Sequence, residues 1–180
     1  MSIQMKNKLQ IGVIGSMADR KLGEKVKKFA DEIGKSIADR DAVLLFGFEG
    51  DFDSVSFIAA RSAEENNGNT IAFIWGKDKQ DLQGLHSTKI VTGQHRGGGR
   101  EFPFILSCDV IISIGGGSGT LMEIAMACQA GIPVIALEKS GGWSQRLAGK
   151  FLDNRKRIRI QRAHSVKETV DLAFKRDNKT

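Results

Sequence analysis

The amino-acid sequence predicts an α/β protein in which helices cover both faces of a parallel sheet. Short, continuously apolar segments alternate with segments of helical periodicity, and glycines gather directly after several of the apolar segments. Strands that are apolar throughout are typical of parallel sheets that are buried on both faces. With 180 residues and 41% hydrophobic content, the chain fits one domain over residues 1–180, and only its two ends are expected to fray.

The first half of the chain contains two strand–helix units and a third strand. Residues 9–15 form an apolar strand, and the helix after it is indicated by apolar residues at spacings of three and four: Leu22, Val26, Phe29, Ile33 and Ile37. A second strand follows at 42–46, a second helix at 54–65 and a third strand at 70–75. This repetition is the pattern of a crossover-connected sheet.

The second half continues the alternation. We expect a brief strand at 89–92, a helix at 101–107, a strand at 109–114, a helix at 119–130 that ends at Gly131, and a strand at 133–137. A helix at 144–152, a strand at 157–160 and a closing helix at 165–175 complete the chain. The strand at 157–160 is predicted because Ile158 and Ile160 alternate with arginines, which would face outward.

Composition excludes several classes of protein. No apolar run approaches the roughly 20 residues that a membrane span needs, and the first ten residues lack the pattern of a signal peptide, so we expect a cytoplasmic protein. Cys108 and Cys128 each lie in an apolar segment, which favours buried thiols over a disulfide or a metal site. The three histidines, His86, His95 and His164, show no metal-ligand spacing, so no metal is predicted.

The net charge of +6 is compatible with an anionic partner. The densest basic run is "NRKRIRIQR" at 154–162, and no aromatic residue is interleaved in it. A solvated strand face is therefore the simplest interpretation, and a nucleic-acid or oligomer contact stays open as the less favoured alternative.

A phosphate-binding loop is predicted at "GGGSGT", residues 115–120, where a strand runs directly into a helix. Unpaired backbone N–H groups and the positive end of the helix dipole meet there, and two hydroxyl groups are available beside them. Ligands of parallel sheets bind beyond the carboxyl ends of the strands, so the end of the first strand belongs to the same rim. The candidate phosphate- or nucleotide-binding residues are Gly15, Ser16, Gly115, Gly116, Gly117, Ser118, Gly119 and Thr120. A glycine-rich turn used only for close packing is the alternative.

Two charged residues accompany this loop. Glu123 lies one turn into the helix, where a carboxylate either caps the helix or serves a bound ligand, for example by holding ribose hydroxyls. Arg100 follows a flexible "RGGG" segment, and its guanidinium suits a phosphate group.

The segment from Arg100 through "CDVIISIGGGSGTLMEIAMA" to "GIPVIAL" resembles the lonely-guy family, the cytokinin-activating phosphoribohydrolases once labelled lysine decarboxylases. It is more similar still to the neighbouring group of Rossmann-like nucleotide-binding proteins that includes molybdenum-cofactor carriers, and the likeness covers most of the chain. In that family an arginine precedes a G-G-x-G-T-x-x-E motif. The resemblance implies that Arg100 and Glu123 serve catalysis and that Gly116, Gly117, Gly119 and Thr120 bind the phosphate. It also implies a Rossmann-like domain that forms a homodimer or a larger homo-oligomer.

The chain departs from the hydrolases in ways that favour the carrier-like group. Gly115 stands where the hydrolases have proline, and Glu101 stands where they have lysine. The turn after the second strand carries Glu49, Asp51 and Asp53 where relatives have consecutive glycines. These carboxylates would repel part of a phosphate-rich ligand or prepare a metal-bridged site, and a solvated acidic loop is the simpler interpretation.

Two functions therefore follow from the sequence. An enzyme of this kind would hydrolyse the N-glycosidic bond of a nucleoside 5′-monophosphate to a base and ribose 5-phosphate. A carrier would instead retain a nucleotide or a phosphorylated pterin such as molybdenum cofactor without turnover. Binding of nucleic acid is a third and less favoured hypothesis.

Overall fold

The computed structural model describes residues 7–17, 22–48, 50 and 53–175. Its strands are β1 (Gln10–Gly15), β2 (Val43–Phe48), β3 (Asn69–Ile74), β4 (Thr88–Val91), β5 (Val110–Ile114), β6 (Val134–Leu137) and β7 (Gln161–Ala163). Its helices are α1 (Glu24–Ala38), α2 (Val55–Glu65), α3 (Glu101–Leu106), α4 (Ser118–Ala130), the short 3-10 turn η2 (Glu138–Ser140), α5 (Gly142–Leu147) and α6 (Val166–Phe174).

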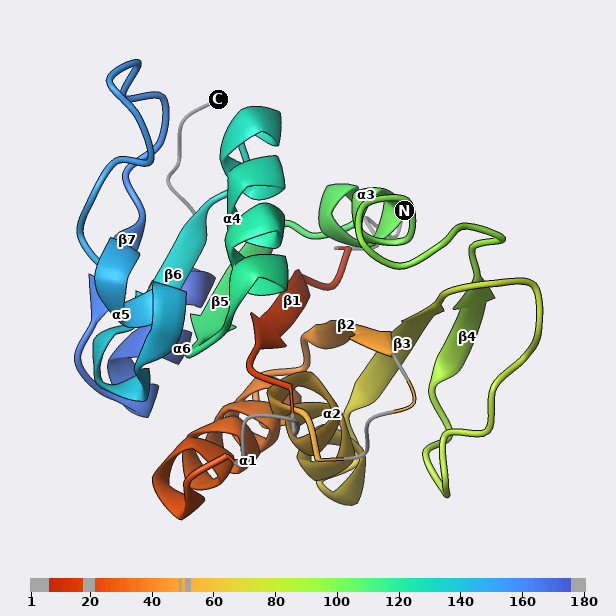
Figure 1. Ribbon diagram of the computed structural model, residues 1–180. Coiled ribbons are helices and arrows are strands. Elements are labelled where there is room, and N and C mark those ends of the chain that lie inside the picture. The colour runs from red at the N-terminus through yellow and green to blue at the C-terminus, as the bar shows by residue number, and fades with distance from the viewer. Residues whose placement is uncertain (1–6, 18–21, 49, 51–52, 176–180) are drawn as a thin grey trace, which may run out of the picture.

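The seven strands form one parallel sheet in the order β4-β3-β2-β1-β5-β6-β7 (Figure 1). The chain builds outward from β1 to β4, then crosses back through α3 to β5 on the other side of β1. The strand order thus reverses between β1 and β5, and in such sheets this is where ligands bind. Gly15 at the end of β1 lies in register with Ile114 at the end of β5.

Helices cover both faces of the sheet, as the apolar strands predicted. On one face α1, α2 and α6 pack against the sheet in a core that contains Ile33, Phe57 and Val170. On the other face, α3 and α4 bury Phe104 and Ile124 against the sheet, and Ala148, directly after α5, is buried beside them. Burial of these two apolar layers is the main stabilising contribution to the fold. The predicted α/β class with a parallel sheet is confirmed.

Local sequence features set the ends of several helices. The Ser54 hydroxyl accepts a hydrogen bond from the backbone N–H of Phe57 at the start of α2, and Ser165 accepts one from Glu168 at the start of α6. Gly131 ends α4 in the left-handed conformation, with φ at 79°, as expected. Both cysteines are free and buried, and burial raises the pKa of both thiols.

Two expectations for the region after β6 are wrong. The helix is Gly142–Leu147 rather than 144–152, because Ala148 leaves the helical conformation and Gly149 has φ at 78°. Residues 157–160 are not a strand of the sheet; β7 begins at Gln161. Instead, the chain folds back so that Phe151 and Arg159 form an antiparallel bridge, and Ile160 donates a backbone hydrogen bond to Lys150. The alternation of isoleucine and arginine belongs to this hairpin-like arm.

Within the part of the chain that the structure describes, no helix is long and apolar enough to cross a membrane.

Candidate ligand-binding site

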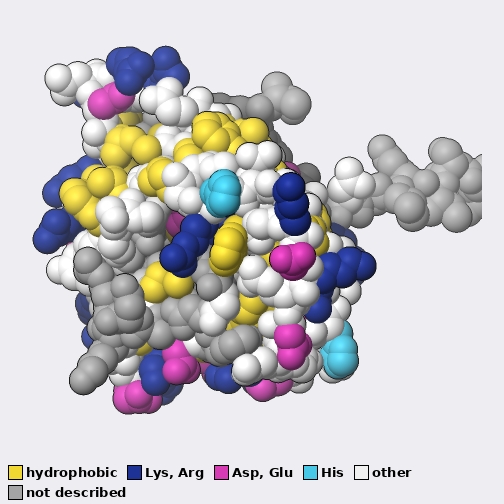
Figure 2. Space-filling model, turned by 45° about the vertical axis from the view of Figure 1, so that its right-hand side comes forward, with side chains coloured by type: hydrophobic (Ala, Val, Ile, Leu, Met, Phe, Trp, Pro, Cys, Tyr) yellow, Lys and Arg dark blue, Asp and Glu magenta, His cyan; other side chains and the backbone are white. Residues whose placement is uncertain are grey.

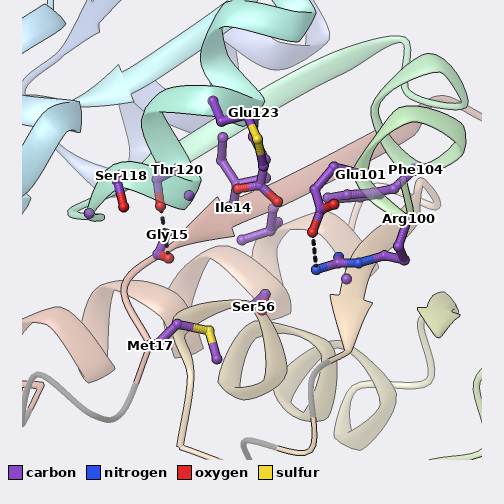
Figure 3. A pocket seen from close by; sticks show the side chains of 15 residues that line it. Ile14, Gly15, Met17, Ser56, Arg100, Glu101, Phe104, Ser118, Thr120 and Glu123 are labelled. Atoms are coloured by element: carbon purple, nitrogen blue, oxygen red, sulfur yellow. Dashed lines mark hydrogen bonds and ion pairs between the residues drawn. The ribbon is translucent and has the colours of Figure 1, made fainter. Parts of the chain in front are cut away.

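A cavity of about 240 Å³ opens at the carboxyl ends of β1 and β2, beside the start of α4 (Figure 3). Its wall includes residues from β1, β2, α2, α3 and α4, elements that are far apart in the sequence. The lining residues are Val13, Ile14, Gly15, Met17, Gly47, Ser56, Arg100, Glu101, Phe104, Gly117, Ser118, Gly119, Thr120, Met122 and Glu123. The cavity therefore lies at the reversal of strand order.

The glycine loop after β5 is fixed by hydrogen bonds to the neighbouring loops. The backbone N–H of Gly115 donates to the hydroxyl of Ser140 at 2.8 Å, and that of Gly116 donates to the hydroxyl of Ser16 at 2.7 Å. The Ser144 hydroxyl donates to the carbonyl of Gly115 at 2.7 Å. Three of the predicted binding residues, Ser16, Gly115 and Gly116, thus shape the loop and do not line the cavity.

The first turn of α4 faces the cavity and carries the other predicted phosphate-binding residues. No side chain caps this helix, and its N-cap residue is Gly117. The Thr120 hydroxyl donates to the carbonyl of Gly15 at 3.0 Å, whereas Ser118 and Gly119 are exposed. The unpaired N–H groups of a first helical turn and the helix dipole favour an anion at this position.

Arg100 and Glu101 form a buried ion pair at the other side of the cavity, with Nη2 of Arg100 2.8 Å from Oε1 of Glu101. The second carboxylate oxygen accepts a hydrogen bond from the backbone N–H of Gly98 at 2.6 Å. The Arg100 side chain, 2% exposed, passes directly over β2, because a Cβ atom at Gly47 would stand 1.3 Å from its Nη1. Only glycine therefore fits at position 47 while the Arg100 side chain lies over β2.

Glu123 projects from α4 on the side of the cavity opposite to this ion pair (Figure 3). It is partly buried, and its charge contributes, after burial itself and Asp109, to the raised pKa of the Cys108 thiol. The structure thus brings the two predicted catalytic residues, Arg100 and Glu123, to one cavity with the start of α4. The cavity presents the N-terminus of α4 and the Glu123 carboxylate on one side and the Arg100–Glu101 ion pair on the other.

Sequence reasoning missed several lining residues. The close approach at Gly47 was detectable, because an isolated glycine inside an apolar strand often marks a place where another group comes near the backbone. Met17, Ser56, Phe104 and Met122 carry no comparable signature, since their positions depend on how the helices pack.

The acidic turn gives no metal site among the described residues. Glu49 and Asp51 lie outside the described residues, and Asp53 is exposed. Within the described ranges, no group of three or more His, Cys, Asp or Glu side chains is arranged to hold a metal ion.

An apolar groove between α3 and α4 adjoins the cavity, and hydrophobic side chains gather on this part of the surface in Figure 2. Phe102 and Leu106 on α3 are 54% and 60% exposed. Met122 lines both the groove and the cavity. The groove is lined by Phe102, Ile105, Leu106, Met122, Ala125, Met126, Gln129 and Ala130.

The fold and the position of the cavity define a class: parallel α/β proteins with a ligand site at the reversal of strand order. The model of the SLOG cluster4 family matches residues 8–170, and the chain belongs to this family.

Three solved structures are similar over nearly the whole chain. The X-ray structure of TM1055, a structural-genomics target, has a TM-score of 0.81 and 27% sequence identity to this chain. The alignment covers 91% of this chain and 97% of the TM1055 chain. The molybdenum cofactor binding protein of Rippkaea orientalis has a TM-score of 0.76 and 30% sequence identity. The alignment covers 92% of this chain and 95% of that protein's chain. The molybdenum cofactor carrier protein of Chlamydomonas reinhardtii has a TM-score of 0.76 and 29% sequence identity. The alignment covers 92% of this chain and 96% of that protein's chain.

Proposed function

We propose that this protein is a non-catalytic carrier of a phosphorylated pterin, molybdenum cofactor, whose phosphate binds at the first turn of α4. The observation that carries the proposal is the uncapped start of α4 at Gly117–Thr120, which opens into the cavity. A helix N-terminus favours a doubly charged phosphate more than any neutral group. Two structural relatives bind or carry molybdenum cofactor, and they share about 30% identity with this chain.

The charged side chains of the cavity suit the rest of such a ligand. Carboxylates accept hydrogen bonds, and a pterin ring presents N–H donors along one edge. Glu123 and the Arg100–Glu101 pair line the cavity within reach of one ligand that extends from the first turn of α4. In this proposal the two sides of the cavity recognise different chemical groups of the same molecule.

The buried ion pair favours a carrier over a hydrolase. Hydrolysis of an N-glycosidic bond needs an acid that protonates the leaving base and a carboxylate that stabilises the oxocarbenium-like transition state. A carboxylate whose charge a neighbour already neutralises contributes less to that stabilisation. Here Glu101 meets the charge of Arg100 at 2.8 Å, and Gly47 lies against the guanidinium. The Arg100 side chain is thus held in place rather than directed at a phosphate.

The decisive experiment measures the ligand that co-purifies from a host that makes molybdenum cofactor. We expect molybdenum by mass spectrometry and the fluorescent oxidation product of the pterin, at up to one equivalent per chain. Gly119→Asp should lower both at least tenfold, because its carboxylate would occupy and repel the phosphate position. The helix itself tolerates an acidic residue in its first turn. Gly119→Ala is the matched control, since a Cβ atom there meets no atom within 4 Å, and it should retain the ligand. A wild-type protein without pterin, or equal loading of the two variants, would refute the proposal.

Hydrolysis of a nucleoside 5′-monophosphate is the second candidate function, and the presence of both Arg100 and Glu123 at the cavity favours it. Release of free base from a panel of nucleoside 5′-monophosphates, N6-modified adenylates included, tests it directly. Release that is lost in Glu123→Gln would assign the hydrolase activity. No release by the wild type, together with bound pterin, would leave the carrier function.

We further propose that two copies associate through the groove between α3 and α4 and that the protein acts in the cytoplasm. Burial of Phe102 and Leu106 would remove from water the two most exposed large apolar side chains of the described residues. Light scattering should give a dimeric or larger mass for the wild type and a monomeric mass for Leu106→Glu. A monomeric wild type would exclude this interface. Lys28→Glu, a charge change on the exposed side of α1, is the control.

A further inference from the structure

The excess positive charge of the chain is concentrated in one segment. Residues 139–162 contain eight Lys and Arg residues and a single acidic residue, Asp153, a net charge of +7, whereas the whole chain carries +6. The other 156 residues therefore have 19 basic and 20 acidic residues and a net charge of −1. The eight basic residues, all of them exposed, are Lys139, Arg146, Lys150, Arg155, Lys156, Arg157, Arg159 and Arg162. We call this set the basic edge.

The basic edge follows one side of the molecule. Its residues lie on η2, on α5, on the arm between α5 and β7, and on β7 itself, which is the last strand of the sheet (Figure 1). One end of it adjoins the ligand site, because the backbone N–H of Trp143 donates to the carbonyl of Gly116 at 3.1 Å. The arm projects from the body at the end of the sheet opposite to the cavity (Figure 1).

Several of these cations are held in fixed positions rather than on free side chains. Arg157 donates to the side-chain oxygen of Gln129 at 2.8 Å, and Arg159 donates to the carbonyl of Gly149 at 2.8 Å. The arm is closed by the Phe151–Arg159 bridge and by an ion pair of Arg155 with Asp153 at 2.8 Å. A partner that binds here meets an ordered surface, so binding loses little side-chain entropy.

The composition of the basic edge is that of a protein interface. Arginine and aromatic residues are enriched in such interfaces, and they supply most of the strongly contributing contacts. Five of the eight cations are arginines; the Arg146 guanidinium lies 5.0 Å from the centre of the Trp143 ring, and Phe151 is 39% exposed. A single-stranded nucleic acid would stack its bases on aromatic rings set among the cations, and the densest part of the edge, "NRKRIRIQR", has none.

From this arrangement we propose that the basic edge binds an acidic face of another protein. The partner's carboxylates pair with the arginine forks, and its apolar rim contacts Trp143 and Phe151. The proposal concerns a surface apart from the cavity, so it stands whether or not the ligand is a pterin.

The test uses poly-L-glutamate as an acidic polypeptide probe, with binding to the full-length protein measured by fluorescence anisotropy at 0.15 M salt. The triple variant Lys139→Glu, Lys150→Glu and Lys156→Glu changes the charge of the basic edge and leaves the hydrogen bonds of Arg157 and Arg159 in place. The matched control is Lys25→Glu, Lys28→Glu and Lys35→Glu, which gives the same change in net charge on exposed positions of α1. We expect the first triple variant to weaken binding at least tenfold and the control to weaken it less than threefold.

Equal weakening in the two triple variants would overturn the proposal, because it would show attraction to net charge alone. A 20-base-pair DNA duplex that binds more tightly than poly-L-glutamate at equal charge concentration would also overturn it and assign the surface to nucleic acid. If the protein binds neither poly-L-glutamate nor the duplex, the proposal is also overturned. A glutamine version of the first triple variant, checked by thermal unfolding, gives the same comparison if charge reversal impairs folding.

Discussion

Two glycine-rich loops border the candidate site, and they differ in why they contain glycine. In the loop after β5, Gly116 has φ at 94°, and a Cβ atom there would stand 2.4 Å from the Thr120 side chain. In the loop before α3, Gly97 has a similar φ of 89°, but a Cβ atom there would meet no atom within 4 Å. Both positions need a left-handed backbone, and only the first also lacks space.

The two loops are also held by different groups. Buried hydroxyls of Ser140 and Ser144 and the hydroxyl of Ser16 fix the loop after β5 through several hydrogen bonds. In the loop before α3, the Glu101 carboxylate accepts a hydrogen bond from Gly98 and pairs with Arg100, and the backbone N–H of Arg100 donates to the carbonyl of His95. The comparison teaches that two loops of similar composition are held differently. Buried hydroxyls hold the first, which directs a helix N-terminus at the cavity, and a buried ion pair helps to hold the second.

The largest effect is expected from Glu101→Ala, which removes the carboxylate that pairs with Arg100 and accepts from Gly98 in the second loop. The Arg100 guanidinium would stay buried without its carboxylate, and loss of one partner of a buried pair costs about 3 to 5 kcal/mol. Urea unfolding measures this loss of stability. The control is Glu32→Ala, which breaks the exposed Lys28–Glu32 pair at 3.7 Å and should cost less than about 0.5 kcal/mol. Similar losses in the two variants would mean that Glu101 does not hold this loop.

A smaller effect is expected from Gly116→Ala, which tests the rigid loop. Unfavourable φ and the clash with Thr120 together should cost about 2 to 4 kcal/mol, equivalent to a fall in Tm of roughly 4 to 16 °C.

Gly97→Ala carries the φ penalty alone and should cost about 1 kcal/mol. Calorimetry of both variants measures the two losses of folding stability. If Gly116→Ala and Gly97→Ala lower the stability equally, close packing does not distinguish the two loops.

The smallest effect is expected at Asp171, far from both loops, where ion pairs act only at the surface. The hydrogen bonds from Lys167 and Arg40 lower the pKa of this carboxyl from its ordinary 3.8 to about 2. Because the pKa is lower in the folded protein, the stabilising contribution is complete above the unfolded value and is lost as the pH falls from about 4 to 2.

We therefore expect Asp171→Asn to have a slightly lower Tm than the wild type at pH 7 and most of this difference to be lost at pH 2. Thermal unfolding across this pH range measures the difference. A difference that persists unchanged at pH 2 would show that the carboxylate charge is not its source.

The sequence by itself determined the fold class, the succession of strands and helices as far as β6, and the place of the glycine-rich turn before α4. These features depend on local periodicity and on glycine directly after an apolar strand, and both are readable over a few residues. It also indicated that the two cysteines are buried, because each lies in an apolar segment.

Only the tertiary structure decided which of the predicted loop residues face the cavity. Ser16, Gly115 and Gly116 were predicted to bind the ligand, yet their polar groups bond to neighbouring loops, whereas Ser118 and Gly119 stay exposed at the cavity. The course of Arg100 over Gly47 depends on two residues that are 53 positions apart, and no local pattern encodes such a contact. The arm after α5 was misassigned for the same reason: an alternating pattern specifies an extended chain but not the partner with which it pairs.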